Sequence, residues 1–274
     1  MTSRPFRFAM QATPADGEQW LAAARRAEDL GYSTLLMPDG TQLLSPLPAL
    51  AMAAGATVSL RVGTWVLASP LRPPRLAAWD AHTLSVLTGG RFELGIGTGR
   101  PEAVEQSVRL LERPAPDGRQ RLALAEQTID ELRRLDQNQH TPVLMAAAGP
   151  KAIALAAAKA DIITLATGPL SNRDEVAAMV AKAIQAADGR ASQLEFAAPL
   201  FVVGDEAPPW VARFLQVDYA TLVALDSPYI LRGTATEMAD ELRRRREATG
   251  ISYISVNGAF AGQFAPVVEL LAGR

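Results

Sequence analysis

Glycines, hydroxyls and a few charged residues follow the predicted strands, and they are the residues best placed for chemistry. Residues 92–96 predict a short buried strand, and the turn Gly97-Thr98-Gly99-Arg100 leads from it into helical sequence that begins at Pro101. A polar turn at the N-terminus of a helix is where α/β proteins commonly bind ligands, because backbone N–H groups without partners point outward there. This turn is therefore a candidate binding element.

Two later turns have the composition of an anion site. Ala148-Gly149-Pro150-Lys151 follows the predicted strand 142–147, and Thr167-Gly168 follows the predicted strand 161–165. Proline at a first helical position is preorganised for the helix, and the N–H groups beside it are free to bind an anion. Neighbouring loops of this kind predict one shared phosphate site, with ordinary turn formation as the alternative for each loop alone.

Charged side chains are scarce at the predicted strand ends, where Asp39 is the carboxylate and Arg100 is the cation. Asp39 either contacts a cofactor or substrate, or caps N–H groups of its own loop. Arg100 either clamps an anionic substrate or cofactor tail, or is solvated at a helix start, where a cation opposes the helix dipole. We expect neither a metal site nor a Ser/His/Asp arrangement, because no histidine occurs at these strand ends. A bound cofactor would then carry out the reaction.

Eight predicted strands, each followed by helical sequence, position these residues. The strands are short and rich in Val, Ile and Leu, as expected when both faces of a sheet are buried. Eight βα units in 274 residues predict one α/β domain, residues 1–274, folded as a TIM (β/α)8 barrel with its active site at the C-terminal ends of the strands. A doubly wound sheet is the alternative. The predicted strands are residues 6–11, 33–37, 60–67, 92–96, 142–147, 161–165, 194–203 and 251–256, and residues 210–225 and 236–248 are predicted as helices.

Bulk composition argues against several classes of protein. The formal net charge of −2 gives no basic surface for nucleic acid, and the absence of cysteine excludes disulfides and thiol chemistry. No apolar run reaches about 18 residues and no signal peptide is evident, so we expect a cytoplasmic protein that does not enter a membrane. Arg72, Arg75 and the arginine run 243–246 are predicted to be solvated surface residues.

Several segments resemble the luciferase-like monooxygenases, and in particular the flavin- or deazaflavin (coenzyme F420)-dependent oxidoreductases found in actinobacteria. The resemblance covers nearly the whole chain in the same order, although each segment alone is weakly specific. The segments are residues 27–39 (AEDLGYSTLLMPD), 60–67 (LRVGTWVL), 87–99 (LTGGRFELGIGTG), 142–168 (PVLMAAAGPKAIALAAAKADIITLATG) and 227–257.

The resemblance implies a TIM barrel with a cofactor ring across its mouth and a small organic substrate above the ring. The cofactor would be FMN or coenzyme F420, with F420 slightly favoured, and the chain would form a homodimer. The cofactor phosphate would lie on Gly149–Lys151 and Thr167-Gly168, and Gly97–Gly99 would form a wall of the site. A non-proline cis peptide at Trp65 or its neighbour would lie behind the ring, which adds Thr64, Trp65 and Val66 to the cofactor site.

Three features depart from the family pattern. Gly40 stands where many deazaflavin-dependent members have a histidine after the aspartate, and Arg100 stands where some dehydrogenases have a glutamate. The excursion between the fourth and fifth strands is shorter than usual, with only residues 136–141 between helix and strand. These departures motivate an alternative: a catalytically reduced or non-redox barrel that binds the cofactor or another phosphate-bearing ligand without turnover.

Overall fold

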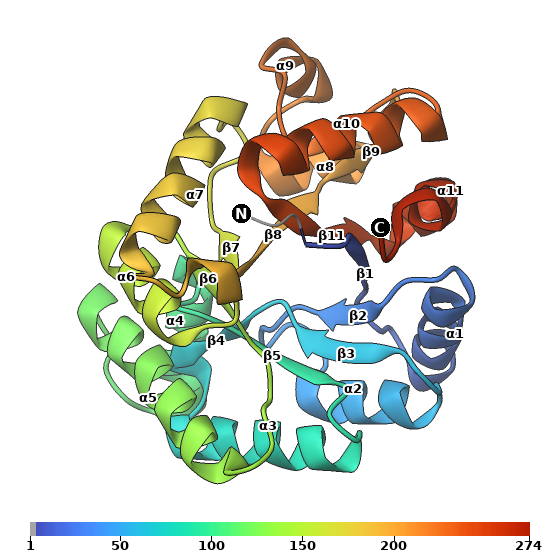
Figure 1. The fold of residues 1–274 in the computed structure, drawn as a ribbon. Helices are drawn as coiled ribbons and strands as arrows, with labels where there is room; N and C mark the ends of the chain where they lie inside the picture. The colour runs from blue at the N-terminus through green and yellow to red at the C-terminus, as the bar shows by residue number, and fades with distance from the viewer. Residues whose placement is uncertain (1–3) are drawn as a thin grey trace.

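The computed structural model describes residues 4–274, which form a closed barrel of parallel strands ringed by helices (Figure 1). Over this range the barrel sheet runs β3-β2-β1-β11-β8-β7-β6-β5-β4, and a further pairing of β3 with β5 closes it. Because β3 and β4 are two parts of one barrel position, eight positions complete the circle. The predicted TIM barrel is confirmed.

The barrel strands are β1 (Arg7–Gln11), β2 (Thr34–Met37), β3 (Arg61–Thr64) with β4 (Leu67–Ala68), β5 (Phe92–Gly97), β6 (Val143–Ala147), β7 (Ile162–Leu165), β8 (Glu195–Leu200) and β11 (Ile251–Asn257). The surrounding helices are α1 (Gly17–Asp29), α2 (Pro46–Gly55), α3 (Pro74–Leu87), α4 (Pro101–Leu111), α5 (Gly118–Asp136), α6 (Pro150–Lys159), α7 (Arg173–Ala186), α10 (Ala235–Thr249) and α11 (Ala261–Leu271). None of the helices in residues 4–274 combines the length and hydrophobicity needed to cross a bilayer.

Local sequence signals fix many helix starts. Reciprocal capping boxes begin α5, α7 and α10, with Asp117, Asn172 and Thr234 as the respective N-caps. Proline occupies the first turn of α2, α3, α4 and α6, where its missing N–H costs no helical hydrogen bond. These seven helices therefore begin where the local sequence supplies a capping residue or a proline.

The structure corrects two predicted elements. The predicted strand 194–203 divides into β8 and β9 (Val202–Val203), and β9 pairs with the unpredicted β10 (Ile230–Leu231) in a separate small sheet. The predicted helix 210–225 is two helices, α8 (Pro209–Leu215) and α9 (Tyr219–Ala224). The chain breaks between them because Gln216 adopts a left-handed conformation with φ 56°, and Asp218 then caps α9.

Charged residues lie inside the barrel at the N-terminal end of its strands. Glu93 is 2% exposed and accepts hydrogen bonds from Arg7 and Arg61, each at 2.6 Å. Arg7 also binds Glu195 and stacks over the ring of Tyr253, whose hydroxyl donates to Glu93. Burial alone would raise the pKa of Glu93, but the two arginines hold it below its usual range. This balanced ionic layer closes the end of the barrel opposite the predicted site.

Candidate active site

The peptide bond between Trp65 and Val66 is cis and lies between β3 and β4, at the mouth of the barrel. This finding confirms the predicted cis bond, and the predicted strand 60–67 is divided at this point into β3 and β4. The Trp65 ring meets Tyr253 edge to face at 6.5 Å. Both Trp65 and Val66 pack against an apolar cluster made by Ala9, Leu36, Leu144, Ile162, Ala197 and Tyr253. The two residues therefore cover the barrel interior and face the mouth.

Glycines on β5 allow this bend to approach the sheet closely. A Cβ atom at Gly95 would lie 1.8 Å from the carbonyl oxygen of Thr64, and one at Gly97 would lie 2.9 Å from a methyl group of Val66. The Thr64 hydroxyl donates to the Gly95 carbonyl at 2.7 Å, so it is used within the wall. Only glycine fits at position 95, because the obstructing atom is backbone.

The turn after β5 is held from behind by Arg121 of α5, a residue that the sequence analysis does not single out. Its Nη1 atom donates to the carbonyl oxygens of Thr98 at 3.1 Å and Gly99 at 3.0 Å. Gly99 has φ 77° and packs against Pro70, so a larger residue would be strained there. The turn is thus a fixed part of the mouth.

The two predicted phosphate loops lie next to each other. Ala166 N–H donates to the carbonyl oxygen of Ala147 at 2.8 Å, which joins the chain after β7 to the end of β6. Gly149 is the N-cap of α6 and gives no side-chain cap, and Pro150 follows it. Ala148, Gly149, Pro150 and Lys151 are all exposed.

The same loops have the features of a place for an anion. A Cβ atom at Gly149 or Gly168 would meet nothing within 4 Å, so both backbones are open to a ligand. The Thr167 hydroxyl is buried and has no hydrogen-bond partner in the described residues. A buried hydroxyl without a partner is costly, and a ligand oxygen would satisfy it. These residues fit the phosphate group of a cofactor.

Asp39 lies two residues after β2 and is fully engaged by protein atoms. Its side chain is 2% exposed, and its two oxygens accept hydrogen bonds from Arg72 at 2.6 and 3.0 Å. The Ala68 N–H donates to the same carboxylate at 3.0 Å. This geometry favours the capping role over the catalytic role, although the capped N–H lies on β4. Arg72 is therefore wrongly predicted as a solvated surface residue.

Arg100 follows the β5 turn directly, is the N-cap of α4, and is exposed. Among residues 4–274 no side chain or backbone group forms a hydrogen bond or ion pair with its guanidinium. Its central carbon lies 5.5 Å from the centre of the Phe214 ring, on α8. Asp39 and Arg100, the two charged residues predicted at the strand ends, share no hydrogen bond or ion pair.

The segment that carries α8 extends across the mouth. Phe214 packs on Phe201 just after β8 at 6.4 Å, and Trp210 packs on Phe260 just after β11 at 6.3 Å. Together with the Arg100 contact, these packings connect α8 to the ends of three barrel strands. The chain therefore has a long excursion after β8, in addition to the short one between β5 and β6.

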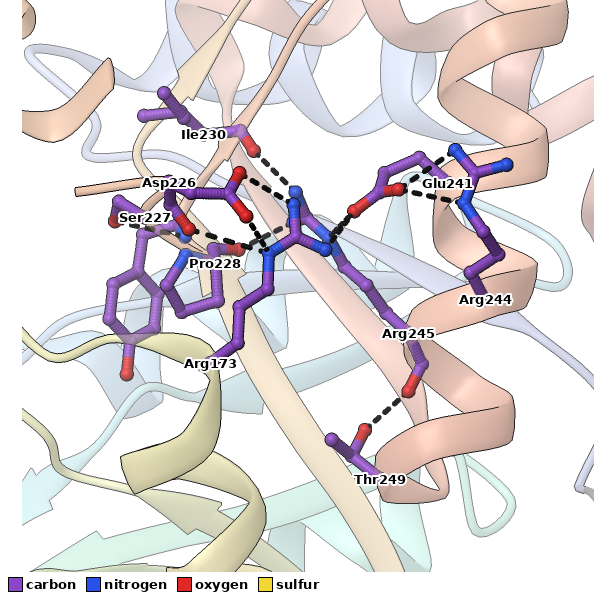
Figure 2. Close-up of polar contacts among 10 residues, drawn as sticks. Arg173, Asp226, Ser227, Pro228, Ile230, Glu241, Arg244, Arg245 and Thr249 are labelled. Atoms are coloured by element: carbon purple, nitrogen blue, oxygen red, sulfur yellow. Dashed lines mark hydrogen bonds and ion pairs between the residues drawn. The ribbon is translucent and has the colours of Figure 1, made fainter. Parts of the chain in front are cut away.

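An ion network fixes the exit of this excursion, as Figure 2 shows. Arg173 at the start of α7 binds Asp226 and Glu241, and Arg245 of α10 binds Glu241 at 2.8 Å. Arg245 also donates to the carbonyl oxygens of Pro228 and Ile230, and its side chain is only 14% exposed. The prediction of a solvated arginine run at 243–246 is therefore wrong for Arg245.

A polar pair at the ends of β1 and β11 also belongs to the mouth. The Gln11 side-chain amide donates to the Ser255 hydroxyl at 2.7 Å. Ser255 is missed by sequence reasoning, although the alternation of residues along β11 places Tyr253, Ser255 and Asn257 on one side. By contrast, a cavity of about 460 Å³ lies at the other end of the barrel, between Arg4, Arg7 and Gly273, and contains none of the predicted site residues.

A family model described as luciferase-like monooxygenase matches residues 2–267. The chain belongs to the luciferase-like monooxygenase family. It is 36% identical over 96 residues to a Mycobacterium tuberculosis protein named for coenzyme F420-dependent oxidoreductase activity. The aligned region covers 34% of this chain and 26% of that protein. It is 33% identical over 121 residues to 4-hydroxyprotoasukamycin monooxygenase of Streptomyces nodosus subsp. asukaensis. Here the aligned region covers 42% of this chain and 31% of the monooxygenase. The chain thus spans less than half the length of these relatives.

Solved structures of the luciferase-like family share the fold. An F420-dependent secondary alcohol dehydrogenase superposes with a TM-score of 0.76 at 16% identity, over 96% of this chain and 98% of the other. A riboflavin lyase solved with modified FMN superposes with a TM-score of 0.73 at 13% identity, over 97% and 92% of the two chains. Family members are oxidoreductases and monooxygenases, which supports an enzyme here.

Proposed function

We propose that this luciferase-like protein is a flavin- or deazaflavin-dependent oxidoreductase or monooxygenase that acts on a small organic substrate. The observation that carries the proposal is the pair of neighbouring loops at Gly149 and Gly168, called here the phosphate cradle, where both glycine backbones are open and the buried hydroxyl of Thr167 has no partner in the described residues. The Trp65–Val66 bend, approached closely by Gly95 and Gly97, adds apolar side chains to the same mouth. A phosphate-bearing planar cofactor matches both features.

The residues of the chain would divide the work of binding and orientation. Gly149, Lys151 and Thr167 would hold the cofactor phosphate through N–H groups, a cation and a hydroxyl. Trp65, Val66 and the turn Gly97–Gly99 would support the ring. When bound, such a cofactor supplies two-electron redox chemistry, and the protein supplies fit and electrostatics.

Proton transfer is the part of the chemistry for which this mouth offers few groups. The carboxylate of Asp39 is engaged by Arg72, and position 40 is glycine. The Ser255 hydroxyl that accepts from Gln11 is fully buried. Gln11 and Asn257, at the ends of β1 and β11, are neutral polar residues that remain partly exposed at the mouth. We therefore infer that the substrate or water supplies the proton, with these neutral groups positioning it.

We propose two candidate cofactors, F420 and FMN, and slightly favour F420. Support for F420 comes from the similarity to the M. tuberculosis protein named for F420-dependent activity. The monooxygenase relative supports an oxygen-using reaction instead. We further propose that the protein is cytoplasmic and, separately, that it forms a homodimer.

The test is a titration of purified protein with FMN and, separately, with F420, followed by absorbance, and then turnover with a reductant or oxidant. We expect one of the two to bind and to change redox state in the presence of substrate. Binding of neither would overturn the proposal. Binding without turnover of any reductant or acceptor would favour the alternative of a non-catalytic barrel. The ion pair of Asp39 with Arg72 and the glycine at position 40 already motivate that alternative.

A further inference from the structure

An unpaired cation and a half-exposed aromatic ring meet above the mouth. Arg100 lies in the turn after β5 and has no acidic or carbonyl partner in residues 4–274, whereas Arg72 binds Asp39 and Arg121 donates to the carbonyl oxygens of Thr98 and Gly99. Phe214 is 54% exposed even though it lies on a helix that packs against two strand ends. In residues 4–274 the Arg100 guanidinium has no ion pair, and the contact with Phe201 leaves more than half of Phe214 uncovered.

We infer that Arg100 and Phe214 form a substrate subsite for a planar organic anion, an aromatic carboxylate or a phenolate. The inference rests on the proposed function, because the substrate would lie between this pair and the cofactor ring. It adds the chemical class of the substrate, which the proposed function leaves open.

The geometry of the pair leaves the hydrogen-bonding edge of the guanidinium free. The Arg100 guanidinium lies within the roughly 6 Å range of a cation–π contact with Phe214. Nothing in the described chain uses its N–H donors, which match the two oxygens of a carboxylate. An anion bound to this edge would be oriented relative to the mouth by a side chain that the aromatic contact holds in place.

The helix to which Arg100 belongs also favours an anion. Arg100 is the N-cap of the 11-residue helix α4, so its positive charge opposes the positive end of the helix dipole. An anion placed beside the guanidinium relieves this repulsion. The acidic residue of this first turn, Glu102, forms no ion pair with Arg100 in residues 4–274, so the guanidinium is left free for an anion.

The aromatic part of the ligand would be recognised by the excursion. Phe214 and Phe201 pack edge to face at 6.4 Å, and both belong to the segment that spans the mouth. The exit of this segment is anchored to α7 and α10 by the network in Figure 2. A fixed aromatic surface beside a cation selects a planar acid over an aliphatic one.

The test compares 4-hydroxybenzoate with 4-hydroxybenzamide, which differ in charge but hardly in shape. Calorimetric titration of the cofactor-loaded wild type should show the acid binding about 10-fold more tightly or better, as expected for a charge-assisted hydrogen bond. Arg100→Gln should remove this preference, and Phe214→Leu should weaken both ligands several-fold. Arg109→Gln, which changes an exposed arginine in the last turn of the same helix, is the matched control and should leave the preference intact.

Equal binding of acid and amide to the wild type would overturn the subsite, as would an acid preference that survives in Arg100→Gln. Loss of cofactor affinity in Arg100→Gln with no change in acid preference would instead assign Arg100 to a cofactor tail, and would also overturn it. Failure of both FMN and F420 to bind would overturn the proposed function alone. The preference for acid over amide would then be measured on the same protein without added cofactor, where its absence overturns the subsite.

Discussion

Asp39 and Arg72 form a bidentate ion pair, with distances of 2.6 and 3.0 Å, that is buried behind the Trp65–Val66 bend. Through the Ala68 N–H the same carboxylate ties the end of β2 to β4. Asp39 thus lies where a catalytic carboxylate is expected from the sequence, but its contacts are those of a positioning residue. The pair would keep the wall of the cofactor site in place.

Asp39→Asn should therefore destabilise the fold and weaken cofactor binding together. Removing one partner of a buried ion pair leaves the other charge uncompensated, which costs about 3–5 kcal/mol of unfolding free energy. The double variant Asp39→Asn with Arg72→Gln should recover part of this loss, because no unpaired charge remains. Urea unfolding and cofactor titration measure the two effects.

The control for this experiment is Arg75→Gln, since the Arg75 side chain is 87% exposed in its ion pair with Glu131 and should contribute little. Unchanged stability of Asp39→Asn would contradict the positioning role and restore the catalytic hypothesis for Asp39. In that case Asp39→Asn would lower kcat and leave cofactor affinity unchanged.

Gly149→Asp should separate helix stability from cofactor binding. An aspartate at the N-cap of α6 would accept a backbone N–H and stabilise the helix by a few tenths of a kcal/mol relative to glycine. The same carboxylate would occupy the phosphate cradle and repel a phosphate, which should weaken cofactor binding at least about 10-fold. Thermal unfolding and cofactor titration on one sample give both values.

Gly149→Ser is the matched variant, because it also caps the helix but carries no charge. It should retain more cofactor affinity than Gly149→Asp. Equal affinity of the aspartate variant and the wild type would show that no phosphate lies at this helix start.

The sequence predicts best what depends on neighbouring residues. Capping residues and prolines place the helices, and apolar strand segments separated by helices give the barrel. The glycine turns at Gly149 and Gly168 are also visible, because open backbone needs a particular local composition. What the sequence does not reveal depends on residues far apart in the chain.

Arg72 and Arg245 illustrate this limit. Each is an arginine in a charged or proline-rich segment, which on its own predicts solvation. Arg72 binds the carboxylate of Asp39, 33 residues away in the chain. Arg245 donates to the carbonyl oxygens of Pro228 and Ile230, which are 17 and 15 residues away. The break between α8 and α9 is a partial exception, since Asp218 is a recognisable N-cap within an otherwise continuous helical pattern.

A stripe of exposed apolar residues on α3 predicts how two copies of the chain would meet. Leu76, Trp79 and Val86 follow one face of the helix, and Trp79 is 62% exposed. We propose that this exposed apolar stripe forms the interface between two copies of the chain, since exposed apolar surface often lies at protein interfaces. Light scattering of the wild type should give a dimer mass, and Trp79→Lys should give a monomer with unchanged thermal unfolding. Leu110→Lys, at an exposed position on α4, should remain dimeric. A monomeric wild type would contradict the prediction.

The network that anchors the excursion should make stability depend on acid pH. Burial alone would raise the pKa of Glu241, but hydrogen bonds from Arg245, Arg173 and Arg244 outweigh it and lower the pKa from 4.5 to about 2. Because the folded-state pKa is depressed, the stabilisation is fully present above about pH 4.5 and is lost as the pH falls towards 2.

Glu241→Gln should therefore unfold at a lower temperature than the wild type at pH 6, and the difference should shrink between pH 4.5 and pH 2. Other carboxylates with depressed pKa values, such as Glu28, are present in both proteins and cancel from the difference. A difference that stays constant over this range would mean that the Glu241 charge does not stabilise the fold. Limited proteolysis within residues 204–226, faster in Glu241→Gln than in the wild type, would locate the weakened segment at the excursion over the mouth.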